Sequence, residues 1–324
     1  MEPILSVNHL VTEFSGDFGG GAVVDNVSFD AYPQKTLCIV GESGCGKSVT
    51  CLSIMGLLGR SGKVTGGEVR FDGQNLIGLS DKQLDEVRGS KLAMIFQDAL
   101  SSLNPVFTVG NQLTEAIRAH LPLSKKEAKT RALQLLSKVG LPDPEAIFKS
   151  YPHTLSGGQR QRVMIAMALS CDPKLLIADE PTTALDVTIQ KQIMALLKQL
   201  QRENGMSILL ITHDMGLVAQ MADQVLVMYA GQLVEEAPVK TLFRTPAHPY
   251  TRALLKSVPS IRDTHERVLE SIQDTVPEHY ESMTGCRFRS RCPYATAQCE
   301  QTQCVIDLGN GHKVRCHLAG EVEA

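Results

Sequence analysis

The stretch Gly41-Glu42-Ser43-Gly44-Cys45-Gly46-Lys47-Ser48 decides the fold class of this chain. It matches the pattern G-x-x-x-x-G-K-[ST] in full, follows an apolar run at residues 37–40, and precedes a segment with a helical pattern. Glycines in such a loop let backbone amides point at phosphate oxygens, and the helix N-terminus adds partial positive charge. The sequence therefore predicts a nucleotide phosphate site, formed by Gly41, Ser43, Gly44, Cys45, Gly46, Lys47, Ser48 and Val49.

Two acids follow a second apolar run, in Leu175-Leu176-Ile177-Ala178-Asp179-Glu180. Open α/β sheets place their ligands at the carboxyl ends of their strands, so both acids are expected near the phosphates. Asp179 can hold Mg²⁺ together with the Ser48 hydroxyl, while Lys47 reaches the β- and γ-phosphates. Glu180 is then the group expected to polarise an attacking water.

A second phosphate-type site is predicted in Leu155-Ser156-Gly157-Gly158-Gln159, which precedes an apolar helical segment. Ser156 is a good N-cap residue, and the exposed amides of a helix N-terminus attract anions. Either the chain binds two anions, or this site serves a nucleotide that another chain holds.

The chain has 324 residues, which favours two domains or one large domain with an appendage. Apolar runs alternate with helical patterns over roughly the first 255 residues, which predicts an α/β domain. Strands are expected at residues 37–40, 69–73, 175–178, 208–211 and 225–228, and a helix is expected around residues 189–200. Apolar residues near the N-terminus precede a Gly-rich turn at residues 16–21. Residues 111–150 favour helices and are interpreted as an insertion, whereas residues 257–285 resemble a linker.

Composition excludes several classes of protein. The net charge is −3, which excludes a polycationic nucleic-acid binder, and no nucleic-acid partner is expected. The longest apolar run has seven residues, from Val163 to Leu169, whereas a membrane span needs about 20. The N-terminal residues show no secretory signal, so we expect a reducing compartment without disulfides.

Six motifs in this order resemble those of the ATP-binding subunits of ABC transporters, over about residues 4–255. Besides the phosphate loop and the acid pair, residues 155–159 are similar to the signature motif of that family. Gln97 resembles the Q-loop glutamine, Asp186 the D-loop aspartate and His213 the switch histidine. Phe14 resembles the aromatic residue that stacks on adenine, with Phe18 as its rival.

The resemblance implies a P-loop ATPase domain at residues 1–256, with a RecA-like core, an antiparallel β subdomain and a helical subdomain at about 98–165. It also implies a head-to-tail pair of such domains, with ATP between one phosphate loop and the signature of the other chain (Ser156, Gly157, Gly158, Gln159). Gln97 would sense Mg²⁺ and the attacking water, His213 would contact the γ-phosphate, and Glu180 would be the catalytic carboxylate.

Further segments, among them residues 96–105 and 248–255, resemble the D-type ATPase of bacterial oligopeptide and dipeptide importers, a group whose relatives also carry nickel, glutathione and other small solutes. The resemblance implies a heterodimer with an F-type ATPase, two transmembrane permeases and an extracytoplasmic solute-binding protein. It places the chain peripherally on the cytoplasmic face of the bacterial inner membrane. A soluble ABC ATPase without a transport role, for example in iron–sulfur assembly, is the alternative.

Five of the nine cysteines crowd into a short C-terminal stretch, within the predicted linker and Cys-rich domain at residues 257–324. The core spacing comprises Cys286, Cys292, Cys299 and Cys316, with Cys304 as an extra. Four thiolates suit a [4Fe–4S] cluster or Zn²⁺, although tight C-x2-C pairs are missing, and free thiols are the third possibility. The segment resembles the C-terminal part of importer ATPases, some of which hold a [4Fe–4S] cluster. Arg287, Arg289 and Arg291 are expected to offset the thiolate charge.

Overall fold

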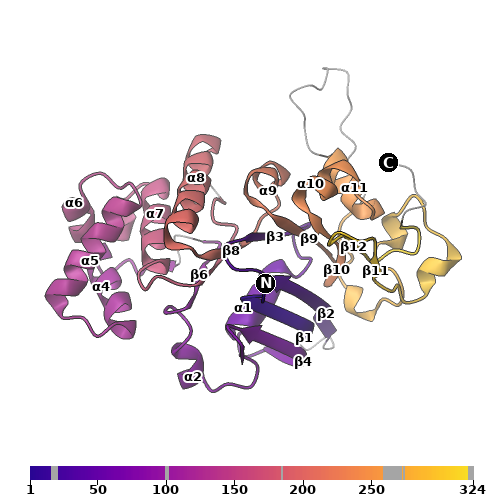
Figure 1. Ribbon diagram of the computed structural model, residues 1–324, viewed down its shortest axis with the longest axis horizontal. Coiled ribbons are helices and arrows are strands. Elements are labelled where there is room, and N and C mark those ends of the chain that lie inside the picture. The colour runs from indigo at the N-terminus through magenta and orange to yellow at the C-terminus, as the bar shows by residue number, and fades with distance from the viewer. Residues whose placement is uncertain (16–20, 99–101, 184, 258–271, 273, 320–324) are drawn as a thin grey trace. The chain divides into compact units, whose positions relative to one another are not determined.

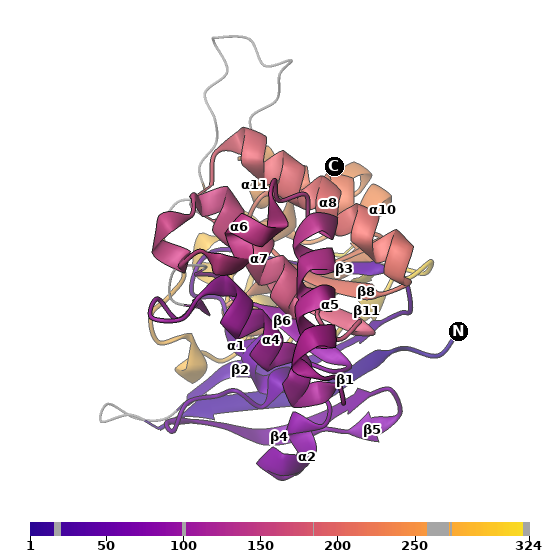
Figure 2. The ribbon, with the colours of Figure 1, turned by 90° about the vertical axis from the view of Figure 1, so that its left-hand side faces the viewer.

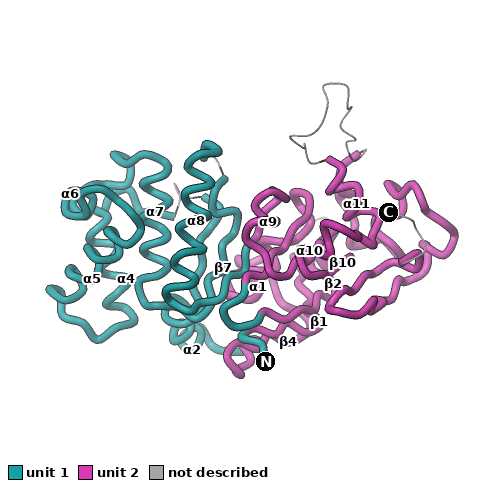
Figure 3. The backbone as a smooth tube through the Cα atoms, turned by 45° about the horizontal axis from the view of Figure 1, so that its top comes forward, with its two compact units in different colours: residues 1–4, 32–35, 78–210 teal, residues 5–31, 36–77, 211–324 magenta. Residues whose placement is uncertain are grey.

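A computed structural model describes residues 1–15, 21–98, 102–183, 185–257, 272 and 274–319 of the chain. These residues form two compact units, which Figure 3 distinguishes by colour. Unit 1 comprises Met1–Ile4, Tyr32–Lys35 and Gly78–Leu210, and unit 2 comprises Leu5–Ala31, Thr36–Ile77 and Ile211–Ala324.

Unit 2 contains a four-stranded antiparallel sheet in the order β2-β1-β4-β5 (Figure 2). Its strands are β1 (Leu5–Phe14), β2 (Gly21–Ala31), β4 (Gly62–Phe71) and β5 (Gln74–Asn75). The buried residues of β1, among them Leu5, Val7 and Leu10, occur with near-alternate spacing, because one face of the sheet packs on the core. Helix α1 (Lys47–Met55) packs against β1, β2 and β4. The strand expected to run into a turn at residues 69–73 is thereby confirmed, since β4 ends at Phe71.

The second sheet of unit 2 has the strand order β11-β12-β10-β9-β3. Strands β3 (Thr36–Val40) and β9 (Gln224–Tyr229) are parallel, and β10 (Gln232–Pro238) runs antiparallel to β9. All of β3 is buried, as expected for a parallel strand that is covered on both faces. The helices that accompany these strands are α9 (Met215–Met221), α10 (Val239–Arg244) and α11 (Pro249–Lys256).

Unit 1 contains the strands β8 (Ser207–Ile211), β7 (Leu175–Asp179) and β6 (Leu92–Ile95), which are neighbours in that order. Strands β6 and β7 are parallel, and β7 and β8 are buried along their whole length. Helix α8 (Val187–Asn204) turns Ile193, Leu197 and Leu200 inward, which confirms the helix expected there. The short helix α2 (Asp81–Asp85) belongs to the same unit.

Residues 109–168 of unit 1 are mainly helical, as predicted for residues 111–150 (Figure 1). Four α-helices lie in this described stretch, and each begins at a side-chain cap that satisfies amides without a partner inside the helix. The capping residues, in chain order, are Thr108, Ser124, Asp143 and Ser156. The helices are α4 (Val109–His120), α5 (Lys125–Lys138), α6 (Pro144–Lys149) and α7 (Gly157–Ala168), with a 3-10 turn η1 (Pro152–Thr154) before α7. The predicted subdomain begins at about residue 98, next to residues 99–101, which lie outside the described residues.

The C-terminal segment from Asp274 to Ala319 belongs to unit 2 and has little regular structure. It contains the 3-10 turns η2 (Tyr280–Ser282), η3 (Arg289–Arg291) and η4 (Ala297–Glu300) and the strands β11 (Ile306–Asp307) and β12 (Lys313–Val314). Strand β12 pairs with β10, and Val314 and Cys316 pack with Ala247. Much of the expected linker at 257–285 lies outside the described residues.

In the part of the chain that the structure describes, no helix is long and apolar enough to cross a membrane. Most of the apolar run that begins at Val163 lies in α7, where Val163, Ile165 and Ala166 are fully buried.

Candidate nucleotide-binding site

The phosphate loop, residues 41–48, connects β3 to α1 in unit 2. A Cβ atom at position 41 would lie 2.1 Å from the carbonyl oxygen of Met228, so only glycine fits there. Gly46 is the N-cap residue of α1 and has φ of 101°, a conformation that favours glycine. The loop therefore leads into a helix N-terminus whose amides have no side-chain cap, which is the arrangement that binds phosphate groups.

Lys47 is buried within the loop, and its ammonium is held by backbone carbonyls. Its Nζ donates to the carbonyl of Gly41 at 2.8 Å and to that of Glu42 at 2.9 Å. Cys45 lies beside it, and burial raises the pKa of the Cys45 thiol. Ser43 and Gly44 are exposed, while Ser48 and Val49 are half-buried.

The outside of the phosphate loop is held by residues that the sequence analysis missed. The Glu42 amide donates to the Tyr250 hydroxyl at 2.9 Å, and the Cys45 carbonyl accepts from the Gly231 amide at 2.9 Å. Arg291 binds the Glu42 carboxylate. Since Arg291 lies 249 positions from Glu42, no local sequence signal could have indicated this pair.

Phe14 and His213, the other candidates in unit 2, lie at the ends of strands. Phe14 is the half-buried last residue of β1, and its ring lies across Gly62 of β4. Its rival Phe18 lies outside the described residues. His213 is exposed between β8 and α9, directly before Asp214, whose side chain caps α9 by accepting from the amides of Gly216 and Leu217.

Unit 1 brings the candidate catalytic carboxylate together with the Q-loop glutamine. Asp179 ends β7 and is buried, and Glu180 follows it. The Gln97 side-chain amide donates to Oε2 of Glu180 at 3.2 Å, and the Thr183 hydroxyl donates to the same oxygen at 2.9 Å. The role of Thr183 was not predicted from the sequence.

The backbone at Glu180 is strained. Its φ of 44° is unusual for a residue with a side chain and costs about 1–3 kcal/mol. Such strain persists only where the surroundings enforce it, and it clusters at functional sites. The conformation turns the chain sharply after β7, and the Thr183 amide donates back to the Glu180 carbonyl at 3.1 Å.

The signature residues form the N-terminus of α7 in the same unit. The exposed Ser156 is the N-cap residue: its hydroxyl oxygen accepts from the Gln159 amide at 3.3 Å, and Gln159 Oε1 accepts from the Ser156 amide at 2.9 Å. A hydroxyl that accepts in this way keeps its own proton to donate to an anion. This confirms the predicted N-cap.

Helix α7 and the D-loop region are closely packed within unit 1. A Cβ atom at Gly158 would lie 3.0 Å from Ile189 of α8, and one at Gly157 would lie 3.4 Å from Leu185. Asp186 caps α8 by accepting from the Ile189 amide at 2.9 Å. Position 184, the first residue of the predicted D-loop, lies outside the described residues.

Three of the four core cysteines of the C-terminal segment have thiol pKa values above the ordinary value. Burial raises the pKa of Cys286 to about 11, and nearby Cys299, Cys316 and Cys292 add to the increase. Burial also raises the pKa of Cys292 and Cys316. Yet among the described residues, no group of three or more His, Cys, Asp or Glu side chains is arranged to hold a metal ion.

The arginines of this segment have other partners than expected. Arg287 pairs with Asp25 at 2.8 Å, and Arg291 pairs with Glu42 at 2.7 Å. Arg289 Nη1 donates to the Thr284 carbonyl at 3.4 Å. Two of the three cations that were expected to offset thiolate charge therefore neutralise carboxylates, because a buried ion needs an opposite charge at contact distance.

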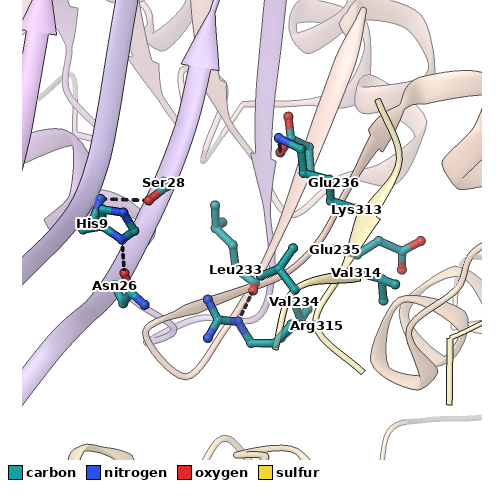
Figure 4. A pocket seen from close by; sticks show the side chains of 11 residues that line it. His9, Asn26, Ser28, Leu233, Val234, Glu235, Glu236, Lys313, Val314 and Arg315 are labelled. Atoms are coloured by element: carbon teal, nitrogen blue, oxygen red, sulfur yellow. Dashed lines mark hydrogen bonds and ion pairs between the residues drawn. The ribbon is translucent and has the colours of Figure 1, made fainter. Parts of the chain in front are cut away.

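A cavity of about 260 Å³ lies elsewhere in unit 2 (Figure 4). Arg315, whose Nε donates to the Leu233 carbonyl, lines one part of it, and His9, Asn26 and Ser28 line another. In the described part of the chain, the lining residues of this cavity include none of the nucleotide-site candidates.

Two protein families match the chain. Residues 24–183 match the ABC transporter family, and residues 234–299 match the family described as oligopeptide/dipeptide transporter, C-terminal region.

Relatives match over nearly the whole chain. The dipeptide transport ATP-binding proteins DppD of Haemophilus influenzae and Bacillus subtilis are each 50% identical to it, over 97% and 98% of this chain and 95% of their own. The Escherichia coli DppD is 47% identical over 97% of this chain and 96% of its own. These relatives give no support to the soluble, non-transport alternative.

A solved structure shares the fold: the ATP-binding cassette MJ0796, in a dimeric post-hydrolysis state bound to ADP and Pi. It has a TM-score of 0.66 and 29% identity, and the match covers 72% of this chain and 98% of that chain. The chain therefore belongs to the ATPases of ABC transporters, within the group that carries the oligopeptide/dipeptide transporter C-terminal region.

Proposed function

We propose that this chain hydrolyses ATP to power the import of dipeptides or oligopeptides by membrane-embedded partners. The observation that carries the proposal is the match to dipeptide transport ATP-binding proteins along 97% of the chain, including the C-terminal region. The intact set of candidate residues supports turnover rather than mere nucleotide binding.

In the proposed mechanism, residues 41–48 bind the ATP phosphates, and Lys47 neutralises the β- and γ-phosphates. Ser48, Gln97 and Asp179 offer a hydroxyl, an amide oxygen and a carboxylate, which are the oxygen ligands that Mg²⁺ prefers. The metal ion, when bound, offsets the charge that develops on the phosphates. Glu180 polarises the attacking water, Gln97 orients Glu180, and His213 contacts the γ-phosphate.

The signature of one chain is proposed to act on the nucleotide of another. Ser156, Gly157 and Gly158 present a hydroxyl and amides at a helix N-terminus, and Gln159 fixes the serine in its capping box. Asp186 caps α8 next to them. Phe14 stacks on adenine in this proposal. MJ0796, a similar cassette, is dimeric in its solved structure, which supports a paired arrangement.

The proposed partners are a second ATPase of the F type, two transmembrane permeases and, through the permeases, an extracytoplasmic solute-binding protein. The chain would then lie peripherally on the cytoplasmic face of the membrane. The ATPase domain is proposed to end near residue 256, before the Cys-rich C-terminal domain.

Purification tests this function directly. The chain, tagged and extracted in mild detergent from its native membranes, should bring down two permeases and a second ATPase, identified by mass spectrometry. The purified assembly should hydrolyse ATP and take up peptides in vesicles. The Lys47→Ala variant should lose nucleotide binding. The control variant Lys63→Ala, which removes an exposed lysine of β4, should bind nucleotide normally. Recovery of soluble partners alone would contradict the proposal.

We further propose that Cys286, Cys292, Cys299 and Cys316 close around a [4Fe–4S] cluster rather than Zn²⁺ when the metal binds, since the described residues contain no preformed metal-binding group. The support is the spacing of these four cysteines in the sequence and the scarcity of regular structure around them. A small segment without its own large core gains stability from a bound metal. Iron and sulfide analysis of the full chain tests the inference.

A further inference from the structure

The C-terminal segment holds the phosphate loop through a partly buried ion pair. Arg291 Nη1 lies 2.7 Å from Oε2 of Glu42, and Nη2 lies 3.1 Å from Oε1, so the contact is bidentate. The Arg291 side chain is 3% exposed and that of Glu42 is 24% exposed. A bidentate pair of this kind fixes direction as well as distance.

The guanidinium of Arg291 is itself fixed on several sides. Nη2 donates to the Asp274 carbonyl at 2.9 Å, and Nη1 donates to the Tyr229 hydroxyl at 3.3 Å. The cation also lies 5.7 Å from the centre of the Tyr229 ring. Because Arg291 is held in this way, the position of Glu42 is determined by the C-terminal segment.

The same segment reaches the loop at a second place. The Tyr280 hydroxyl lies 3.2 Å from the Val23 carbonyl and 3.5 Å from the Gly44 carbonyl. Arg287 donates to the carbonyl of Ala230, whose neighbour Gly231 donates its amide to Cys45. The segment therefore supports the loop directly at Glu42 and at Gly44. It supports Cys45 indirectly, through the backbone of residues 230 and 231.

The turn that carries both arginines is built around the cysteines. The Cys286 amide donates to the Cys299 carbonyl, and the Arg289 amide donates to the Cys286 carbonyl. Phe288, on the same turn, packs with its ring centre 5.2 Å from that of Tyr229 and 5.3 Å from that of Tyr250. The turn thus has a fixed place against β9 and α11, from which Arg291 reaches the loop.

We propose that Arg291 is a positioning residue for nucleotide binding, which holds the phosphate loop in its binding conformation through Glu42. This inference rests on the proposed role of residues 41–48 in ATP binding. Ordering a glycine-containing loop costs about 1–2 kcal/mol per residue, and a loop that is already ordered does not incur that cost when ATP binds. The C-terminal segment thereby becomes part of the ATP site, although it touches no nucleotide.

The test measures equilibrium binding of a fluorescent ATP analogue with Mg²⁺ to the full chain. Arg291→Gln and Glu42→Gln are each expected to weaken the affinity by about tenfold, because the loop must then be ordered on binding. Arg291→Lys, which keeps the charge but loses the bidentate contact, should restore part of the affinity. Arg289→Gln is the matched control on the same turn and should stay within about twofold of wild type.

Three further measurements separate positioning from a loss of folding. Thermal unfolding of each variant shows whether it is folded; if Arg291→Gln is not, Glu42→Gln removes the same pair and leaves the C-terminal segment unchanged. The double variant Arg291→Gln/Glu42→Gln should bind no more weakly than either single variant. In the assembled transporter, Arg291→Gln should raise the KM for ATP and leave kcat within about twofold.

Clear outcomes would overturn the proposal. These are a folded Arg291→Gln chain with wild-type affinity, an equal loss in Arg289→Gln, or additive losses in the double variant. Failure of the wild-type chain to bind the analogue would instead refute the proposed ATP site itself.

Discussion

The side-chain amide of Gln97 donates to the carboxylate of Glu180 across 3.2 Å. The two residues lie 83 positions apart, and each follows a strand of the same parallel pair, β6 for Gln97 and β7 for Glu180. The Thr183 hydroxyl donates to the same carboxylate oxygen. The carboxylate that the sequence marks as catalytic is therefore oriented by two donors, and one of these is itself a candidate Mg²⁺ ligand.

Glu180→Gln is expected to stop hydrolysis and to retain ATP binding. The amide cannot accept a proton from the attacking water, and general-base catalysis contributes about 100-fold or more to the rate. Phosphate release and nucleotide affinity measure the two effects separately. Thr183→Val, which removes only one orienting hydrogen bond, should lower the rate by about tenfold or less. Unchanged turnover in Glu180→Gln would show that another group is the base.

Ser156→Ala is expected to lower hydrolysis beyond its effect on stability. Loss of the capping side chain costs about 1 kcal/mol of helix stability. Ser124 supplies the matched control, because it caps α5 in the same kind of capping box, with Glu127 in the place of Gln159. Ser124→Ala should show a similar loss in urea unfolding with normal ATP turnover, whereas Ser156→Ala should lose more than tenfold in turnover. Equal activity of the two variants would contradict a role for Ser156 at the nucleotide.

Much of the fold could be predicted because its signals are local. The apolar runs around residues 37–40 and 175–178 indicate strands that are buried on both faces, and β3 and β7 confirm them. The loop at 41–48 and the cap at Ser156 are likewise chemical patterns within a few residues. Such patterns constrain the backbone wherever they occur.

What could not be predicted depends on partners far apart in the chain. The arginines beside Cys286 and Cys292 suggested counter-charges for thiolates, since the cysteines were the nearest anions along the sequence. Arg291 instead binds Glu42, 249 positions away, and Arg287 binds Asp25. The order of strands in the antiparallel sheet is also set by packing, because β4 pairs with β1 across a long intervening stretch.

Stability should fall in acid through His248, the buried N-cap residue of α11. Burial lowers the pKa of His248 to about 3, against about 6.5 in the unfolded chain. Between about pH 3 and pH 6.5 the unfolded chain therefore binds a proton at His248 that the folded chain does not bind. Above about pH 6.5 neither state binds it, and the protein has its full stability with respect to this group. This contribution is lost as pH falls towards 3, by about 1.4 kcal/mol per pH unit.

Urea unfolding at several pH values between 7.5 and 5 measures this slope. His248→Asn keeps an acceptor for the Tyr250 amide, removes the titrating ring and should flatten the dependence. Other carboxylates and histidines, such as the Glu235–His312 pair beside it, remain in both proteins, so the difference between the two slopes isolates His248. Equal slopes would contradict the assignment.

Iron and acid-labile sulfide should accompany the full chain when it is purified without oxygen, at about four irons per chain if the cluster is of the [4Fe–4S] type. Because burial raises the pKa of Cys286 to about 11, its thiol is protonated at neutral pH without a metal, and binding must release protons. Affinity for the metal should therefore increase with pH.

Substitutions test which cysteines hold the metal. The Cys299→Ser variant should lose the iron. The Cys304→Ser variant, which changes an exposed cysteine of the same segment, should keep it. Zinc in place of iron would favour the tetrahedral thiolate site, and the absence of both metals would leave the cysteines as packed thiols whose turn serves to position Arg291.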